Sequence, residues 1–370
     1  MRIAINATCF SNRPSGARNR FVGIYRKLFQ LLAHDEFYVY EPVDIRISTW
    51  FSPRSNVHFI ATGQRSELPG QRYLSGKLFW SRELKRLKPD VFETSHLPLV
   101  KSPVGRTIQT IHDIRYLRHP ELYSVFRRLV NQTVLRTALN RADLIVTVSH
   151  AMRKELLEFH PKANVRVVYN GFDGSTYGLI SDQKAREIAQ KLKVPPNFLL
   201  SVGHLEKRKN YPRLLQALKR INQRGHDFHL VIVGNAGDEM AEIYRQIALL
   251  DLSKNVQILR YLEDPELRAL YSLCSLFVFP SSYEGFGIPI LEAMASGCPF
   301  VLSNLPVFRE ITEDRCVYFD PHNTESLAEV LLRTLQSGLE MKKITDYGAK
   351  RVKDFEYENI ALEVAKIYRA

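Results

Sequence analysis

The 370-residue sequence has only four cysteines, and they are scattered without a C-x-x-C pair or metal-ligand spacing. Cys9, Cys274, Cys298 and Cys316 are therefore expected to be reduced residues of a cytosolic protein. No run of eighteen or more apolar residues occurs, which predicts that no segment spans a membrane. The first residues, MRIAINATCF, are too short and too interrupted an apolar stretch for a signal peptide.

Two motifs that would indicate other chemistry are also missing. The sequence has no D-x-D motif and no histidine and aspartate cluster with metal spacing, so we expect neither a metal ion nor another cofactor. No first strand-to-helix turn has G-x-G-x-x-G followed by an acid about twenty residues later. A dehydrogenase built on Rossmann halves would need that fingerprint.

Acidic residues are scarce in the first half of the chain. The formal net charge is +13, and residues 1–176 carry all of this excess, because basic and acidic residues cancel in the remainder. Such asymmetry indicates that the first half meets an anionic partner, unless the charge only keeps the surface soluble. Nucleic acid, an acidic membrane and an anionic substrate are candidates. The sequence has no helix-turn-helix, zinc-finger or aromatic RNA-binding signature, so we expect no nucleic acid.

Short apolar runs alternate with longer amphipathic runs, and this pattern occurs twice. Strands apolar on both faces, each followed by a helix, predict parallel sheets built from βαβ units. The predicted strands are 2–7, 57–62, 90–94, 107–113, 143–149 and 165–171, then 199–203, 229–234, 255–262, 276–281, 299–304 and 316–320. The clearest helical patterns are 21–33, 124–140 and 211–223.

The fold class predicted from this pattern is α/β, with two Rossmann-like, doubly wound domains. A Gly- and Ser-rich stretch begins a linker near residues 173–196, so we expect domains at 1–175 and 176–349. The last predicted helix, 350–370, is amphipathic and is a candidate to pack back on the first domain. Open α/β sheets bind ligands at the carboxyl ends of their strands. Two such domains would line a cleft with those ends.

The loop GHLEKRKNYPRLL follows a predicted buried strand and contains two adjacent cations. Arg208 and Lys209 stand just before a helix whose N-cap is expected to be Asn210. Free backbone N–H groups, the helix dipole and two cations together favour an anion such as phosphate. A solvated basic loop is the alternative.

The loop SSYEGFGIPILEAMA follows the strand at 276–281. Gly285 and Gly287 have no side chains, so a ligand can approach the backbone closely there. Pro289 suits the first turn of a helix. N–H groups near Phe286, Gly287 and Ile288 would then face a pyrophosphate.

The same loop carries two acids. Glu284 precedes the glycine turn, and it can accept hydrogen bonds from sugar hydroxyls. Glu292 lies about two helical turns further on, among Leu291, Ala293 and Met294. A surface position is the alternative for a glutamate in a helix, but these apolar neighbours favour a functional acid that binds a ribose diol.

The segment from Glu284 to Glu292 resembles the E-x7-E motif of the retaining GT-B glycosyltransferases of family 4. Its continuation AMASGCPFVLSN fits the same family, as do GHLEKRKN, TVSHAMRKEL and VVYNGFD. The resemblance covers nearly the whole chain and is strongest over residues 140–325. It implies two sheets facing a central cleft, with a nucleotide-sugar donor bound by the second domain.

The resemblance also implies roles for single residues. In similar enzymes the position of Glu284 binds the donor sugar, that of Glu292 binds the nucleotide ribose, and that of Lys209 stabilises the leaving phosphates. The loop of Arg260, Tyr261 and Leu262 is similar to the one that holds the base through its backbone.

One position departs from the family. Many members have an arginine where this chain has His204, and here Arg208 is expected to supply the missing charge. In this respect the chain resembles the branch of bacterial polysaccharide mannosyltransferases.

Two motifs of the first half are expected to line the side of the cleft that the first domain forms. His112 ends a predicted strand, and in similar enzymes a histidine there lies by the donor sugar. A structural role is the alternative for a lone histidine. The loop NRPSGARNRF places Gly16, Arg18 and Arg20 near a helix start, and it resembles the glycine loop over the donor, although the second glycine is replaced.

The resemblance therefore implies a retaining hexosyltransferase, with mannose from GDP-mannose as the first choice of donor, and the missing metal motifs predict that it is metal-independent. The expected acceptor is a saccharide or lipid-linked saccharide in O-antigen or capsule synthesis. UDP- or dTDP-sugars are alternative donors, and a non-catalytic nucleotide-sugar-binding protein is an alternative function. The basic segments 77–88 and 127–136 mix apolar residues with Lys and Arg, which suits peripheral docking to anionic lipid at the inner face of the cell membrane.

Overall fold

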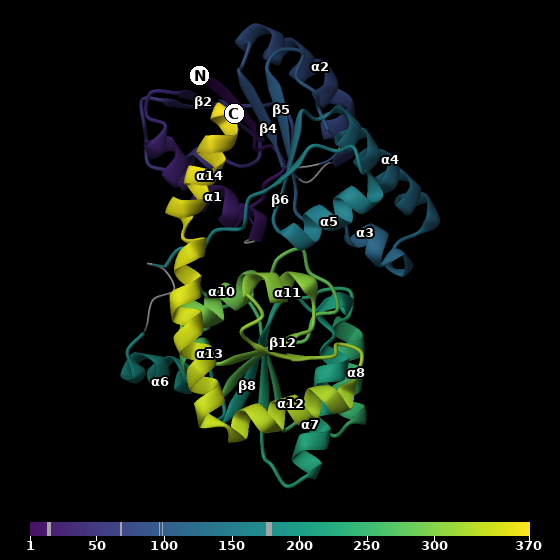
Figure 1. Ribbon diagram of the computed structural model, residues 1–370, viewed down its shortest axis with the longest axis vertical. Coiled ribbons are helices and arrows are strands. Elements are labelled where there is room, and N and C mark those ends of the chain that lie inside the picture. Colours follow the sequence, from purple (N-terminus) through teal and green to yellow (C-terminus); the bar gives the residue numbers. More distant parts are fainter. Residues whose placement is uncertain (13–15, 67–68, 96, 98, 175–179) are drawn as a thin grey trace. The chain divides into compact units, whose positions relative to one another are not determined.

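The computed structural model describes residues 1–12, 16–66, 69–95, 97, 99–174 and 180–370 (Figure 1). The chain forms two compact units. Unit 1 comprises Met1–Gly171 together with Tyr357–Ala370, and unit 2 comprises Phe172–Glu356. Each unit has its own parallel sheet, so the two are described separately.

The sheet of unit 1 has the strand order β3-β2-β1-β4-β5-β6-β7 in the described part of the chain. Every neighbouring pair is parallel, which requires a crossover between paired strands. The order reverses at β1, where the chain turns from one half of the sheet to the other, and ligands bind beside such a switch point in open α/β sheets. The strands are β1 (Arg2–Asn6), β2 (Glu36–Glu41), β3 (Val57–Ala61), β4 (Val91–Thr94), β5 (Arg106–Ile111), β6 (Leu144–Thr147) and β7 (Val165–Val167).

Helices cover both faces of this sheet. The helical segments of unit 1 are α1 (Gly16–Leu31), η1 (Ile47–Trp50), α2 (Pro69–Leu87), α3 (Arg115–Arg118), η2 (Pro120–Leu122), α4 (Val125–Arg141), α5 (His150–Phe159) and α14 (Tyr357–Arg369). Alternate residues of β1 face opposite sides: Ile3 and Ile5 pack in one apolar core with α1 and α14. Ala4 packs in the other core, with Trp80 of α2.

Helix α14 comes from the end of the chain and lies beside α1 (Figure 1). Tyr357, its first residue, donates a hydrogen bond from its hydroxyl to the carbonyl oxygen of Asn19, at 3.0 Å. Its ring fills space that two glycines leave open: a Cβ on Gly23 or on Gly171 would lie 2.1 Å from a ring carbon. The missing side chains therefore allow α14 to pack closely on unit 1.

The sheet of unit 2 repeats the pattern with the strand order β10-β9-β8-β11-β12-β13, again parallel throughout the described residues. Its central strands are fully buried on both faces, as expected where helices cover both sides. The strands are β8 (Phe198–Val202), β9 (His229–Val233), β10 (Val256–Leu259), β11 (Leu276–Phe279), β12 (Phe300–Ser303) and β13 (Val317–Phe319).

The helices of unit 2 have clear sequence causes. Leu214, Leu218 and Ile221 of α7 are buried on one stripe, at the spacing of a helix face. Asn323 caps α12 by accepting from the N–H groups of Glu325 and Ser326. The segments are α6 (Asp182–Lys191), η3 (Lys207–Lys209), α7 (Tyr211–Gln223), α8 (Met240–Leu249), α9 (Asp264–Leu273), α10 (Ile288–Ala295), α11 (Pro306–Ile311), α12 (Thr324–Gln336), α13 (Gly338–Arg351) and η4 (Val352–Phe355).

The structure differs from the sequence prediction in two respects. Strand β2 was not predicted, although it lies next to β1 in the sheet. The strands predicted at 107–113, 165–171 and 255–262 end earlier, at Ile111, Val167 and Leu259, and the last predicted residues of all three are in loops. In the third, Tyr261 has a φ of 58°, a left-handed conformation that interrupts a strand.

We predict that Gly23→Ala destabilises unit 1. Alanine is normally favoured over glycine in a helix by about 1 kcal/mol, but here the new Cβ would overlap the ring of Tyr357. The net loss of unfolding free energy should be about 1–3 kcal/mol, as for overpacked cores. Urea unfolding followed by tryptophan fluorescence measures it, because Trp50 and Trp80 both lie in unit 1.

Gly63→Ala is the matched control, since a Cβ there has nothing within 4 Å. An unchanged urea midpoint for Gly23→Ala, equal to that of Gly63→Ala, would contradict the close packing of α14 on α1.

Candidate functional site

Two loops of unit 2 meet at the carboxyl ends of the neighbouring strands β8 and β11. The first contains η3, and the second joins β11 to α10. The carbonyl oxygen of Arg208 accepts a hydrogen bond from the N–H of Ser282, at 2.8 Å. The side-chain amide of Asn210 donates to the carbonyl oxygen of Pro280, at 3.1 Å. These bonds hold the two loops together.

Asn210 occupies the predicted N-cap position of α7, but its side chain does not cap the helix. It has a left-handed backbone with a φ of 57°, and its amide donates to Pro280 and to the carbonyl oxygen of Pro321. Asparagine tolerates this conformation better than most residues. The residue therefore ties three loops of unit 2 together.

The carboxylate of Glu284 gathers three donors on one oxygen. Its Oε1 lies 2.5 Å from Nη1 of Arg208 and 2.8 Å from Nζ of Lys209. The hydroxyl of Ser281 donates to the same oxygen, at 2.9 Å. Arg208 also pairs through Nε with Glu206, at 2.7 Å. The two predicted cations and the predicted acid are thus in one cluster, in which two acids balance the two cations.

Burial makes the ion pairs of this cluster strong. The Glu284 side chain is 11% exposed. Burial acts to raise its pKa, but Arg208 and Lys209 outweigh that effect and lower the pKa to about 2. Glu284 is therefore ionised at neutral pH. Burial also lowers the pKa of Lys209 from its usual value, against the opposing effect of Glu284.

The backbone and an aromatic ring shape the space around Lys209. Its Nζ lies 4.7 Å from the centre of the Phe279 ring, close enough for a cation–π interaction. A Cβ at Gly203 would lie 2.7 Å from Cε of Lys209. Glycine at 203 therefore leaves the channel in which the lysine side chain reaches Glu284.

Helix α10 carries the second acid. It begins at Ile288 after Gly287, whose φ of 139° favours glycine, and Pro289 is in its first turn. Glu292 is buried, and its Oε2 accepts a hydrogen bond from the hydroxyl of Tyr271, at 2.9 Å. Tyr271, on α9, was not found from the sequence, because no local pattern links a helix tyrosine to an acid on another helix.

The remaining residues predicted at this edge follow the same strands. Gly285 and Phe286 lie in the loop between β11 and α10, and Phe286 is buried, 5.9 Å from the ring centre of Phe355. Tyr261 and Leu262 follow β10. The N–H of Tyr261 donates to Oδ1 of Asn235, at 3.1 Å.

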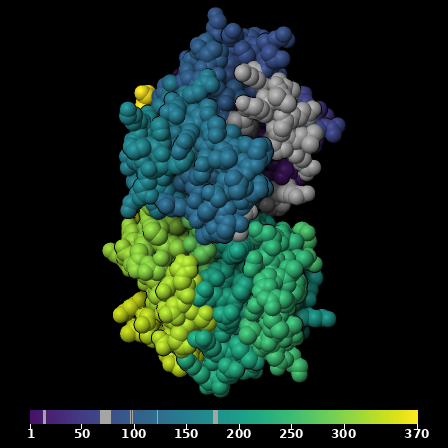
Figure 2. All heavy atoms as spheres, turned by 90° about the vertical axis from the view of Figure 1, so that its right-hand side faces the viewer, coloured from purple at the N-terminus to yellow at the C-terminus, as the bar shows by residue number. Residues whose placement is uncertain are grey.

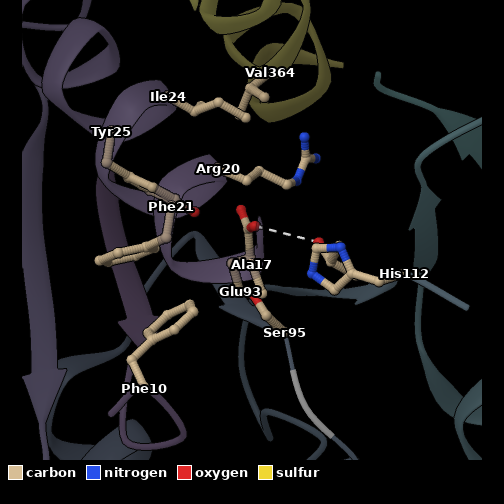
Figure 3. A pocket seen from close by; sticks show the side chains of 11 residues that line it. Phe10, Ala17, Arg20, Phe21, Ile24, Tyr25, Glu93, Ser95, His112 and Val364 are labelled. Atoms are coloured by element: carbon tan, nitrogen blue, oxygen red, sulfur yellow. Dashed lines mark hydrogen bonds between the residues drawn. The ribbon is translucent and has the colours of Figure 1, made fainter. Parts of the chain in front are cut away.

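Four predicted residues belong to unit 1. Gly16 is the first residue of α1, Arg18 and Arg20 lie in the same helix, and His112 follows the last residue of β5. Residues 13–15 of the predicted loop lie outside the described residues. Figure 3 shows a pocket in unit 1 that includes His112. Its lining is Phe10, Ala17, Arg20, Phe21, Ile24, Tyr25, Glu93, Ser95, Thr110, His112 and Val364.

The imidazole of His112 has no hydrogen-bond partner among the described residues. Burial, with a smaller effect of Arg20, lowers its pKa to about 3. The ring is therefore neutral at physiological pH, with one nitrogen able to donate and the other able to accept a hydrogen bond.

The structure adds acids and donors that the sequence did not reveal. Glu93 interrupts the apolar strand β4, and this interruption was a signal that could have been used. Ser281 and Glu206 gave no such signal. Within the described part of the chain, no group of three or more His, Cys, Asp and Glu side chains is placed to hold a metal ion. No described helix combines the length and the apolar character needed to cross a membrane.

Comparison with known families identifies two matching family models and one relative of similar length. The family model of the glycosyl transferases group 1 matches residues 183–351, and that of glycosyltransferase family 4 matches residues 43–175. The O-antigen chain mannosyltransferase B of Escherichia coli is 30% identical over 267 residues, which cover 71% of this chain and 70% of that protein.

Two further similarities concern larger or more distant proteins. The serotype-specific mannosyltransferase WbdA of Escherichia coli is 28% identical over 272 residues, 69% of this chain, but the match spans only 32% of WbdA. The structure of HepE from Anabaena in complex with UDP-glucose has a TM-score of 0.77 and 20% identity, covering 100% of this chain and 99% of that one.

The chain belongs to the glycosyltransferases of family 4 and has the GT-B fold. It is a glycosyltransferase. Both the family and the fold class predicted from the sequence are confirmed.

We predict that Lys209→Met destabilises unit 2 by roughly 3 kcal/mol, the usual effect of breaking a buried ion pair. The substitution leaves the buried Glu284 with a single cation. Calorimetric unfolding measures the loss. The double variant Lys209→Met with Glu284→Gln should recover part of it, because the uncompensated charge is then absent.

Arg245→Met is the matched control, since Arg245 pairs with Glu242 on an exposed helix face, where an ion pair contributes below about 1 kcal/mol. Equal effects of Lys209→Met and Arg245→Met would mean that burial does not strengthen the Glu284 cluster.

We further predict that His112 makes unit 1 less stable as the pH falls. Unfolded histidine binds a proton below about pH 6.5, whereas native His112 stays neutral to about pH 3. Between these values the unfolded state binds more protons, so unfolding becomes more favourable, by up to about 2 kcal/mol at pH 5. Urea midpoints at pH 7.5 and 5.0 measure the change. His112→Asn should reduce it, and the exposed His34→Asn should not.

Proposed function

We propose that the protein transfers a hexose, mannose from GDP-mannose, to a saccharide or lipid-linked saccharide during synthesis of a cell-surface polysaccharide. Membership of family 4 supports the reaction class. The name of the relative that is 30% identical, an O-antigen chain mannosyltransferase, supports the sugar and the pathway class. The cluster of Arg208, Lys209 and Glu284 is the observation in this chain that carries the proposal.

In the proposed complex the donor lies at the carboxyl edge of the unit 2 sheet. Glu292 accepts hydrogen bonds from the ribose diol, while Tyr271 holds its carboxylate in place. The diphosphate is placed beside Arg208 and Lys209 and near the start of α10, where helix N–H groups favour an anion. The loop of Tyr261 and Leu262 faces the base.

Glu284 has a positioning function in this proposal as well as a binding one. It keeps both cations at fixed places before the donor arrives, so that the site is preorganised for negative charge. It is also the acid proposed to accept hydrogen bonds from the donor sugar. We do not assign it as a nucleophile, because its Oε1 is already committed to Arg208, Lys209 and Ser281.

The proposed reaction retains the configuration at the sugar carbon and uses no metal ion. The bond from the anomeric carbon to the phosphate oxygen breaks, and a bond from the same carbon to the acceptor oxygen forms. The acceptor hydroxyl attacks from the face of the leaving group, and a phosphate oxygen takes its proton. Lys209 and Arg208 offset the charge that develops on the leaving diphosphate. Two positions remain predictions: that His112 lies beside the donor sugar, and that Gly16 lies over the donor.

We place acceptor binding in unit 1, with peripheral contact to an anionic membrane. The N-terminal turns of α4 support this contact, because the large side chains of Val125, Phe126, Leu129 and Val130 are all exposed. Arg127 lies among them and is also exposed. Figure 2 shows the surface to which this part of the chain belongs, in blue to teal. An apolar and basic helix face suits the interface of an anionic bilayer.

The other predicted segment, 77–88, contributes less to this surface. Trp80 and Leu84 are buried in the core of unit 1, because α2 packs on the sheet. Leu78 is the large apolar side chain of this segment that is exposed among the described residues. The membrane proposal therefore rests on α4.

UDP-sugars are the second candidate donors. The observation that favours them is the structural similarity to HepE, which was solved with UDP-glucose. The base is held largely through the backbone in the proposed site, so the choice between the two nucleotides is decided by the binding test below.

The first test of the proposed function is thermal unfolding with GDP, UDP, dTDP and ADP. We predict that one nucleotide, GDP, stabilises unit 2, by about 2.7 kcal/mol at one hundred times its Kd. The shift should disappear in Lys209→Ala and Glu292→Ala, and persist in Glu329→Ala, an acid on the exposed face of α12. Hydrolysis of the matching nucleotide sugar without added metal then tests turnover.

A shift with UDP instead would transfer the proposal to UDP-sugars. Binding without any turnover would favour the non-catalytic alternative, and no shift with any nucleotide would refute the donor site.

We also predict that the protein sediments with vesicles containing phosphatidylglycerol and not with neutral phosphatidylcholine vesicles. Phe126→Asp should weaken this binding at least about tenfold. It removes one large apolar side chain that would enter the bilayer, and it adds a negative charge that the anionic lipid repels. Leu249→Asp is the control, because Leu249 is an exposed apolar residue of unit 2. Equal recovery with neutral and anionic vesicles would exclude the membrane proposal.

A further inference from the structure

The pocket of unit 1 contains a buried cation whose hydrogen-bonding capacity is largely unused. Arg20 is 7% exposed and lies in the second turn of α1. Its Nη1 donates to the carbonyl oxygen of Tyr169, at 2.8 Å, and this is its one hydrogen bond with the described residues. A guanidinium has five N–H donors. The others are therefore available to a ligand in the pocket.

Opposite this cation lies a partly buried acid. Glu93, on β4, accepts a hydrogen bond from the hydroxyl of Tyr368, and the hydroxyl of Thr110 lies 3.5 Å from its Oε1. No ion pair joins Glu93 to Arg20 among the described contacts of either residue. Figure 3 shows the two side chains in the same pocket, with His112 and Ser95 beside them.

The carboxylate of Glu93 is held in place by α14, the last helix of the chain. Tyr368 belongs to α14, and its hydroxyl also lies 3.0 Å from that of Tyr25 on α1. Val364 of the same helix lines the pocket. Three elements, α1, β4 and α14, thus place Glu93, and Tyr368 is a positioning residue for it.

The pairing of charges restricts the chemistry of a ligand. An anionic group would be repelled by Glu93, and a cationic group by Arg20. An apolar group would leave the remaining N–H donors of Arg20 without acceptors, which is costly. A hydroxyl group can accept from Arg20 and donate to Glu93 at the same time. The pocket has a free volume of about 20 Å³, which is room for about one water-sized group. It therefore matches a single hydroxyl group of an uncharged sugar whose ring stays outside the pocket.

We propose that Arg20 and Glu93 bind one hydroxyl group of a neutral acceptor saccharide, next to His112, and so select acceptors without a charge at that position. The acceptor role rests on the proposed function. The binding of a neutral sugar to unit 1 can be tested without it, because the pocket residues all belong to that unit.

The test is saturation-transfer NMR on the full chain without nucleotide, with three probes: methyl α-mannopyranoside, mannose 6-phosphate and glucosamine. We expect binding of the neutral glycoside and little of the two charged sugars. Glu93→Gln should weaken binding of the neutral glycoside about tenfold, the usual effect of losing a hydrogen bond to a charged group. It should also admit mannose 6-phosphate, because the repelling charge is gone.

Glu41→Gln is the matched control. Glu41 is a buried acid in the same sheet, but its Oε2 accepts from the N–H of Ser48 and it does not line the pocket. It should leave all three probes unchanged. Tyr368→Phe keeps the ring of α14 and removes the hydroxyl donor to Glu93, and we expect it to weaken binding of the neutral glycoside less than Glu93→Gln does.

Equal binding of the neutral glycoside by the wild type and by folded Glu93→Gln would overturn the proposal, as would a preference of the wild type for mannose 6-phosphate. If Glu93→Gln fails to fold, Tyr368→Phe and Arg20→Lys decide in the same way. The nucleotide shifts are measured in parallel on unit 2. Sugar binding without a nucleotide shift would refute the donor site alone, and a nucleotide shift without sugar binding would refute this proposal alone.

Discussion

A carboxylate that is buried or partly buried requires hydrogen-bond donors from elsewhere in the fold, and this constraint organises both units of the protein. Glu284 draws Arg208 and Lys209 from the loop after β8. Glu292 on α10 is met by Tyr271 on α9, and Glu93 on β4 by Tyr368 on α14. In each case the donor comes from a different secondary-structure element. The acids therefore fix how neighbouring elements pack, before any ligand is considered.

The same constraint explains how Lys209 is used. A lysine in a loop is normally solvated, but here the side chain passes the bare backbone of Gly203 and lies over the ring of Phe279. The ion pair with Glu284 offsets the cost of its burial. A site arranged in this way needs little rearrangement when charge develops on a ligand, which fits a transferase that stabilises a leaving phosphate with side chains and backbone groups.

The sequence was sufficient to predict the loops of unit 2, because glycines, a proline and paired charges mark strand ends by local chemistry. It could not predict partners that depend on tertiary packing. Tyr271 lies in an ordinary helical pattern, and Asn210 was expected to cap α7 but donates to two carbonyl oxygens instead. Strand β2 was missed because EFYVYE has acids at both ends and few β-branched residues. It is a strand because β1 and β3 pair with it on either side.

The position of α14 has a consequence for the order in which the units form. The core of unit 1 includes Tyr357, Ile360, Val364 and Tyr368, which are synthesised only after the whole of unit 2. A ribosome adds roughly 5–20 residues per second, so residues 1–171 wait for many seconds with the apolar face of α1 uncovered. Unit 2 is contiguous and can complete its own core in that interval. The first unit to be translated is thus the second to be finished, and in the meantime it presents a surface that a chaperone would bind.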